Sequence, residues 1–190
     1  MNLMNLVRWQ QKGYIIKIRN GWYCFTGSKS NGNIPWLAAN LIFKPSYISL
    51  NSALSYYDLI PEAVYTTTSI TTKKTNNFNT TLGNYTYNHV KPEIFSFGQT
   101  LIDFDTTPVH PDTGTYRKGR KILLAEPEKA ILDFFYINSN YNTEKDIEHL
   151  RLDGTILNEM LKEKFYTYLE KYKNRALEDR IFRMIKVYTR

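Results

Sequence analysis

The sequence predicts an α+β protein in which a small basic front module precedes a larger, nearly neutral body. Two observations support this fold class. Hydrophobic residues recur with helical spacing at both ends of the chain and with strand-like alternation in the middle. Residues 1–57 contain six Lys or Arg and no Asp or Glu, whereas residues 58–190 contain nineteen bases and eighteen acids. We therefore divide the 190 residues into a front module, 1–44, and a body, 45–190.

The front module is predicted to begin with a helix over 2–12 that Gly13 ends. Two β-prone segments, 14–18 and 22–25, follow it and flank Arg19-Asn20-Gly21, where Asn-Gly favours a hairpin turn. The helix is indicated by residues that recur at helical spacing: Leu3, Leu6, Val7 and Gln10.

A helix followed directly by a basic hairpin is the order seen in winged-helix DNA readers from their recognition helix onward. Side chains suited to base edges are Asn5, Arg8 and Gln11. Side chains suited to phosphates or the minor groove are Lys12, Lys17 and Arg19. Two further helices normally precede the recognition helix, so this winged-helix element is either truncated before Met1 or a reduced domain. The alternative is a small α+β cap with a solvated basic face.

A polar, Gly-containing loop at 26–34 separates this module from a helix that begins at Pro35. The apolar stripe of that helix is Leu37, Ala38, Leu41 and Ile42. The next stretch, 45–62, reads as strand, helix and turn. Its helix is predicted to start from a cap at Asn51 or Ser52 and to stop at Asp58 and Pro61.

Beyond Pro61 the pattern is typical of a mostly antiparallel sheet. The predicted strands are Val64–Thr72, Phe78–Thr81, Tyr85–His89, Ile94–Phe97, Leu101–Phe104 and Lys121–Ala125. A helical tail then begins at Pro127, with further helices after a Thr143 cap, over 156–172 and over 175–188.

Composition argues against several classes of function. Cys24 is the single cysteine, which excludes an internal disulfide and a Cys-based zinc cluster and indicates a reducing cytoplasm. No apolar run approaches the roughly twenty residues that span a bilayer. The three histidines, His89, His110 and His149, lack metal-ligand spacing. We therefore predict no membrane segment, metal, cofactor or catalytic residue.

A metal-dependent nuclease is the enzymatic alternative. It would require Asp112 and Glu128 to hold a divalent ion beside Lys129. The acid-x-Lys spacing fails by one residue, and Pro127 instead favours Glu128 as a first-turn carboxylate of a helix.

A second basic cluster follows Asp112-Thr113-Gly114, which predicts an exposed hairpin. It consists of Arg117, Lys118, Arg120 and Lys121. Two interpretations stay open: a solvated turn, or a second phosphate contact that extends a nucleic-acid footprint.

Three segments carry a family resemblance: KGYIIKIRNGWYCF (12–25), IPWLAANLIFKPSYISLNSALSYYDLIPE (34–62) and AEPEKAILDFFY (125–136). On these motifs the chain resembles the AbiEi antitoxins, transcriptional regulators of AbiE-type (type IV) toxin–antitoxin systems that act in abortive infection, a form of phage defence. The resemblance implies an amino-terminal winged helix that binds inverted repeats in its own promoter and a carboxy-terminal domain needed for antitoxicity. It also implies a nucleotidyltransferase-like toxin that is opposed without a stable complex.

The resemblance carries over no catalytic residue. The positions that it implies for DNA contact are Arg8, Lys12, Lys17, Arg19 and Asn20. The resulting hypothesis is a cytoplasmic DNA-binding autorepressor and antitoxin. The alternatives are a protein- or RNA-interaction module with a vestigial winged helix, and the nuclease described above.

Overall fold

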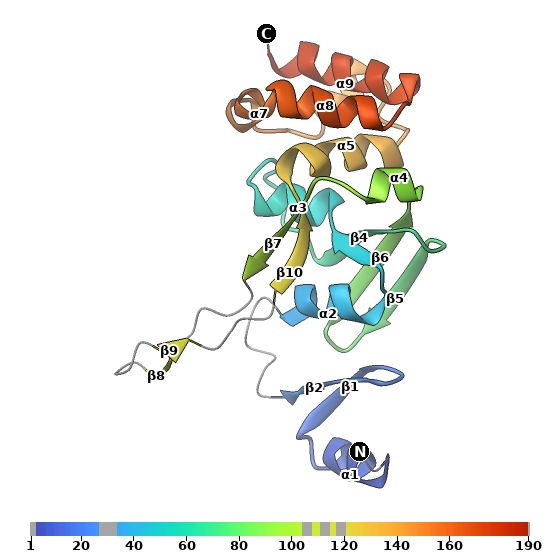
Figure 1. Cartoon of the computed structure of the whole chain (residues 1–190), viewed down its shortest axis with the longest axis vertical. Coiled ribbons are helices and arrows are strands. Elements are labelled where there is room, and N and C mark those ends of the chain that lie inside the picture. The colour runs from blue at the N-terminus through green and yellow to red at the C-terminus, as the bar shows by residue number, and fades with distance from the viewer. Residues whose placement is uncertain (1–2, 27–33, 104–107, 111–114, 117–120, 190) are drawn as a thin grey trace.

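The computed structural model describes residues 3–26, 34–103, 108–110, 115–116 and 121–189. It has the predicted α+β architecture: a front module of one helix and one hairpin, a body built on a mixed sheet, and a tail of helices. These parts follow one another along the longest axis of the molecule, so that α1 and α9 lie at opposite ends (Figure 1).

The front module begins with α1 (Leu3–Gln11), β1 (Ile15–Arg19) and β2 (Trp22–Phe25), which confirms the predicted helix and hairpin. Gly13 and Gly21 adopt positive φ angles of 70° and 83°, as the end of the helix and the tight turn require. The core of this module is small. Leu6 and Ile15 are buried where α1 contacts β1. Val7, which the helical pattern in the sequence grouped with Leu6, is instead 53% exposed.

The predicted helix after the polar loop is α2 (Ile34–Ile42), and it packs on the sheet of the body. Leu37, Ala38 and Ile42 of its apolar stripe are buried in the body's core, Leu41 is partly buried against it, and the side chain of Asn40 joins the helix to the sheet. The Asn40 amide nitrogen donates to the Leu123 carbonyl (3.2 Å), and the Leu123 amide donates to the Asn40 Oδ1 atom (2.6 Å). This segment therefore contributes to the core of the body.

The sheet of the body has six strands in the order β5-β6-β4-β3-β10-β7. Three of its five pairings are antiparallel, and the β4–β6 and β3–β10 pairings are parallel. The strands are β3 (Ser46–Ile48), β4 (Thr66–Thr71), β5 (Asn76–Thr80), β6 (Gly83–His89), β7 (Gln99–Asp103) and β10 (Lys121–Ala125). Two further strands, β8 (Pro108–His110) and β9 (Thr115–Tyr116), form a separate hairpin.

The strand–helix–turn prediction for 45–62 is confirmed by β3 and α3 (Leu50–Tyr56), but the predicted cap is wrong. The helix starts at Leu50, with Ser49 rather than Asn51 or Ser52 in the cap position. Ser49 makes no capping hydrogen bond because its hydroxyl donates to Asp133 Oδ2 (2.8 Å). A tertiary contact has therefore replaced the local one.

Two other predicted elements are wrong. The segment 94–97 is not a strand, since α4 (Pro92–Phe95) covers its first half and a turn its second, with Pro92 and Glu93 in the first turn of α4. The single helix predicted over 156–172 is two helices, α7 (Gly154–Met160) and α8 (Glu163–Lys171). The backbone leaves the helical conformation at Leu161, without a Gly or Pro to mark the break.

The tail is confirmed as helical. In addition to α7 and α8, it contains α5 (Pro127–Ile137), α6 (Glu144–Glu148) and α9 (Arg175–Tyr188). Thr143 caps α6 as predicted, in a reciprocal capping box with Asp146. Helix α5 lies between the sheet side of the body and the outer helices, in contact with α3, α8 and α9 (Figure 1). It contacts both the body and the outer helices of the tail.

Five polar side chains meet inside this junction, and we call them the buried network. Lys129 and Asp133 lie one turn apart on α5, are fully buried and form an ion pair. Asp133 also accepts hydrogen bonds from the hydroxyls of Tyr47 (2.9 Å), Ser49 (2.8 Å) and Tyr172 (2.7 Å). The Lys129 ammonium donates to Tyr172 and to Asp133. Residues from β3, α5 and the end of α8 are thus linked.

The neighbourhood of Lys129 is otherwise aromatic. Its ammonium nitrogen lies 4.8 Å from the ring centroid of Tyr172, 4.9 Å from that of Phe97 and 5.5 Å from that of Tyr47. Gly98 packs directly against the stem of Lys129, and a Cβ at this position would lie 2.9 Å from the Lys129 Cβ. Because solvent does not reach these groups, we assign the buried network a structural role.

We expect the protein to lose stability as the pH rises above about 10. Burial, and then the negative charge of Asp133, raise the pKa of Tyr47 and Tyr172 well above 10.0, and burial raises that of Tyr85 to about 12. These tyrosines ionise more readily in the unfolded chain. Their contribution to stability is therefore complete below the unfolded pKa and is lost as the pH rises from the unfolded pKa through the higher folded pKa. Lys129, whose pKa is lowered by burial, acts in the opposite sense but is a single group.

The measurement is an alkaline titration followed by tyrosinate absorbance and by far-ultraviolet circular dichroism. The buried tyrosines should ionise only together with the loss of helical signal. Complete ionisation of all 15 tyrosines in a chain that stays folded would contradict the prediction.

Candidate nucleic-acid interface

The outward side of α1 carries polar side chains that we predicted from the sequence to contact base edges and phosphates of DNA. Asn5, Arg8 and Lys12 are exposed and recur at intervals of three and four residues, which places them on one face of the helix and its carboxy-terminal end. Gln11 is exposed beside them. The opposite side is anchored by Leu6, so the buried residue determines which face of α1 points outward.

The charged side chains of residues 3–26 are all basic. Residues 3–26 of the front module contain Arg8, Lys12, Lys17 and Arg19, and the first acidic residue of the whole chain is Asp58. An exposed helix face with basic, amide and no acidic side chains can donate hydrogen bonds to phosphates and to base edges. It is therefore suited to a polyanionic ligand.

The two basic side chains of the hairpin, Lys17 and Arg19, point in different directions. Lys17 and Asn20 are exposed. Arg19 instead points to the body, where its guanidinium donates to the Ile42 carbonyl (2.6 Å) and lies 4.5 Å from the ring centroid of Phe78. The pairing of β1 with β2 shifts register between Lys17 and Arg19, and such a bulge re-aims the side chains that follow it.

Further contacts hold the hairpin against the body. Ile18 and Trp22 pack against the body's hydrophobic core, and the hydroxyl of Thr81, in the β5–β6 turn, donates to the Lys17 carbonyl (3.2 Å). The structure thus brings together Asn5, Arg8 and Gln11 on α1 and Lys12 directly after it, with Lys17 and Asn20 on the adjoining hairpin. It places Arg19 in the contact between the front module and the body.

Of the second basic cluster only Lys121 belongs to the described residues. It is exposed and lies 3.9 Å from Asp103, its cross-strand partner on β7. Such a surface pair contributes little stability. Arg117, Lys118 and Arg120 lie outside the described residues.

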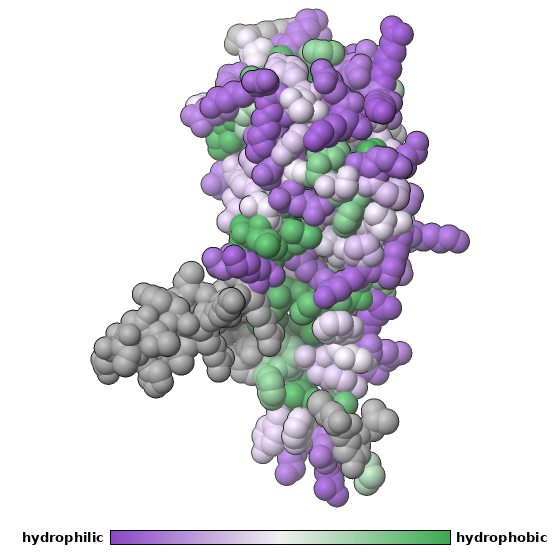
Figure 2. All heavy atoms as spheres, viewed as in Figure 1, coloured by the Kyte–Doolittle hydropathy of each residue, from purple (hydrophilic) through white to green (hydrophobic). Residues whose placement is uncertain are grey.

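Sequence reasoning missed the exposed aromatic residues of the front module. Trp9, Tyr14 and Phe25 are 39%, 58% and 66% exposed. Their number could have indicated this exposure, because a module with so few residues cannot bury every large side chain that it carries. Figure 2 shows hydrophilic side chains over much of the end formed by the tail helices, and hydrophobic surface nearer the junction of the body with the front module.

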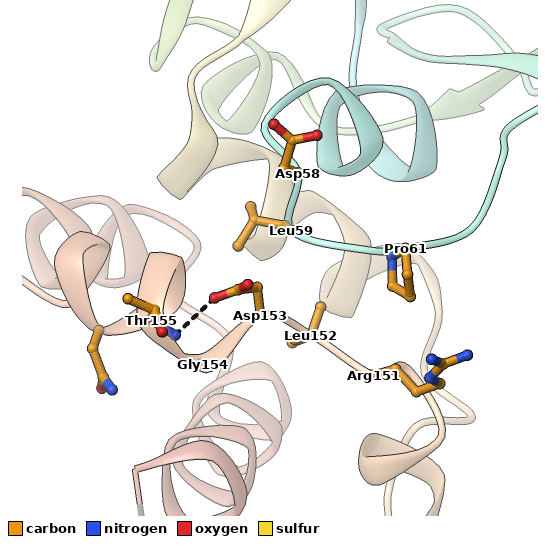
Figure 3. A pocket seen from close by; sticks show the side chains of 9 residues that line it. Asp58, Leu59, Pro61, Arg151, Leu152, Asp153, Gly154 and Thr155 are labelled. Atoms are coloured by element: carbon orange, nitrogen blue, oxygen red, sulfur yellow. Dashed lines mark hydrogen bonds between the residues drawn. The ribbon is translucent and has the colours of Figure 1, made fainter.

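A polar cavity of about 580 Å³ lies at the other end of the body (Figure 3). Asp58, Leu59 and Pro61 face a segment that runs from Arg151 to Thr155. The two sides are joined by a hydrogen bond from the Asp153 amide to the Leu59 carbonyl (3.0 Å). The Asp153 carboxylate caps α7 by accepting from the amides of Thr155 and Ile156. The fold itself uses this carboxylate, and we assign the cavity no chemistry.

Of the two acids invoked for a nuclease, Glu128 belongs to the described residues, and it forms an ion pair with Lys164. The Lys164 ammonium lies 3.1 Å from a carboxylate oxygen of Glu126 and 3.1 Å from one of Glu128, and burial of the Tyr168 hydroxyl beside Glu126 raises its pKa to about 12. Asp112 lies outside the described residues. Among the residues that the structure describes, no group of three or more His, Cys, Asp or Glu could hold a metal ion.

Comparison with models of known protein families and with curated proteins found no match. Within the described ranges, none of the helices combines the length and the hydrophobicity needed to cross a membrane.

Proposed function

We propose that this protein is a cytoplasmic DNA-binding autorepressor and antitoxin of the AbiE type, in which α1 reads double-stranded DNA. The observation that supports DNA binding is the outward face of α1, where Asn5, Arg8, Gln11 and Lys12 are exposed on a module without acidic residues. The sequence resemblance supports the antitoxin role, its operator of inverted repeats and its pairing with a nucleotidyltransferase-like toxin that it opposes without a stable complex.

In the proposed mechanism, α1 enters the major groove. Arg8 suits the two acceptors of a guanine, and Asn5 or Gln11 suits an adenine. Lys12, at the end of the helix, and Lys17, on the hairpin, would contact flanking phosphates, as would Asn20. Repression follows from occupancy of the promoter and requires no catalytic step.

The orientation of Arg19 also favours a second candidate, a protein- or RNA-interaction module with a vestigial winged helix. A wing that binds DNA presents its basic tip to the duplex, whereas Arg19 contacts the body here. In that case the front module would serve as a fixed extension of the body, and the toxin would be neutralised without any operator binding.

Duplex binding should weaken steeply as salt rises, because each phosphate contact releases condensed counterions. Reversing a charge on α1 with Lys12→Glu should reduce the slope of log affinity against log salt by about 1 and weaken binding at every salt concentration. The measurement is fluorescence anisotropy with the chain's own promoter DNA. Lys91→Glu is the matched control, since it changes the net charge equally at an exposed position of the body, between β6 and α4.

Equal effects of the two reversals would show that only total charge matters and would contradict an α1 interface. Salt-independent or absent duplex binding, together with intact toxin neutralisation, would favour the second candidate.

A further inference from the structure

Trp9, Tyr14 and Phe25, which we call the aromatic cluster, lie around the end of α1. The Tyr14 amide donates to the Trp9 carbonyl (2.9 Å), and the amide of Thr26, next to Phe25, donates to the Tyr14 carbonyl (3.0 Å). These hydrogen bonds link the backbones of Trp9 and Tyr14 to that of Thr26, the neighbour of Phe25, although the three aromatic residues come from a helix, a turn and a strand. All three side chains are partly or largely exposed, with Phe25 at 66%.

Cationic side chains lie beside the aromatic cluster. The Lys12 ammonium lies 6.0 Å from the ring centroid of Tyr14, and Arg8 precedes Lys12 by one helical turn on the exposed face. With no acid before Asp58, this surface would repel a second copy of itself. Charge complementarity instead favours a polyanion, and the exposed rings favour one with planar, apolar faces of its own.

We propose that the aromatic cluster binds a single strand of DNA, whose bases stack on Trp9, Tyr14 and Phe25 while Lys12 and Arg8 contact its phosphates. Aromatic side chains beside a positively charged surface are the usual means of binding single strands, because every unpaired base has an accessible π face. A duplex keeps those faces stacked inside the helix. This activity is therefore separate from operator binding and does not depend on it.

The test is fluorescence anisotropy of the full chain with a labelled thymidine strand of roughly 20 nucleotides, longer than the site of one binding module. Tyr14→Ala and Phe25→Ala should each weaken binding about tenfold, within the range measured for loss of one stacking partner. Tyr14→Phe keeps the ring and should bind like the natural protein. Phe182→Ala is the matched control, since Phe182 is 56% exposed on α9 at the other end of the molecule and should have no effect.

The outcomes separate this inference from the proposed function. Lack of binding to the thymidine strand, with duplex binding intact, would overturn the inference alone. Strand binding without duplex binding would support the inference and overturn the operator role. The inference is also overturned if the alanine variants bind the strand as well as the natural protein, or if a uridine strand of equal length binds much more tightly. A dimer in sedimentation that Phe25→Ala dissociates would assign the surface to a second copy and overturn it as well.

Discussion

Replacing Asp133 with leucine should lower the free energy of unfolding by about 3–5 kcal/mol, the cost of breaking a buried ion pair from one side. The Lys129 ammonium would stay buried without its counterion, and the hydroxyls of Tyr47, Ser49 and Tyr172 would each lose an acceptor. Urea denaturation followed by circular dichroism measures the change.

A double variant tests the physical reason. Lys129→Met combined with Asp133→Leu removes the buried charge that has lost its counterion. The free energy of unfolding of this double variant should therefore exceed that of Asp133→Leu alone by at least about 1 kcal/mol. Lys186→Met is the surface control, because the Lys186 pair with Glu144 is half exposed and its loss should cost less than about 1 kcal/mol. A cost below about 1 kcal/mol for Asp133→Leu would contradict the assigned role of the buried network.

Replacing Arg19 with alanine should release the front module from the body without unfolding the body. The substitution removes a hydrogen bond from a charged group to the Ile42 carbonyl and the contact with the Phe78 ring. We expect a loss of about 2–4 kcal/mol in the free energy that holds the hairpin in place. Hydrogen exchange of the β1 and β2 amides should accelerate, while exchange in β4 and β6 stays unchanged.

Lys17→Ala is the matched control for this substitution, because Lys17 lies on the same strand but is exposed, and the body contacts it through its carbonyl oxygen. If both variants leave hydrogen exchange of the hairpin unchanged, Arg19 does not hold the front module. If Arg19→Ala abolishes duplex binding while the hairpin keeps its protection, Arg19 contacts DNA directly, as the sequence alone predicts.

Local signals in the sequence were sufficient for many elements. Asn20-Gly21 identified the first hairpin, Pro127 the start of α5 and Thr143 the cap of α6, because each of these residues acts on its own backbone. Residue 161, where the tail helix breaks, carries no such signal. The break is set by packing, since Leu157 and Phe165 on its two sides are both fully buried.

The residues of the candidate site could be predicted from the sequence, but the orientation of their side chains could be predicted less well. Alternation along a strand would place Lys17 and Arg19 on the same side, but the bulge between them sends Arg19 to the body. The buried network could not be foreseen, because nothing local distinguishes Lys129 and Asp133 from a solvated pair one turn apart on a helix. Their burial depends on the strand that contains Tyr47 and on the helix that ends beside Tyr172, which are distant in sequence.

The order of strands in the sheet has a consequence for how the chain folds during synthesis. The short strand β3 lies between β4, which follows it closely, and β10, which is made about seventy residues later. Tyr172 completes the contacts around Asp133 later still. Contacts of such long range slow folding. The first half of the body therefore leaves the ribosome with one edge of β3 unpaired, and that edge needs protection until β10 emerges.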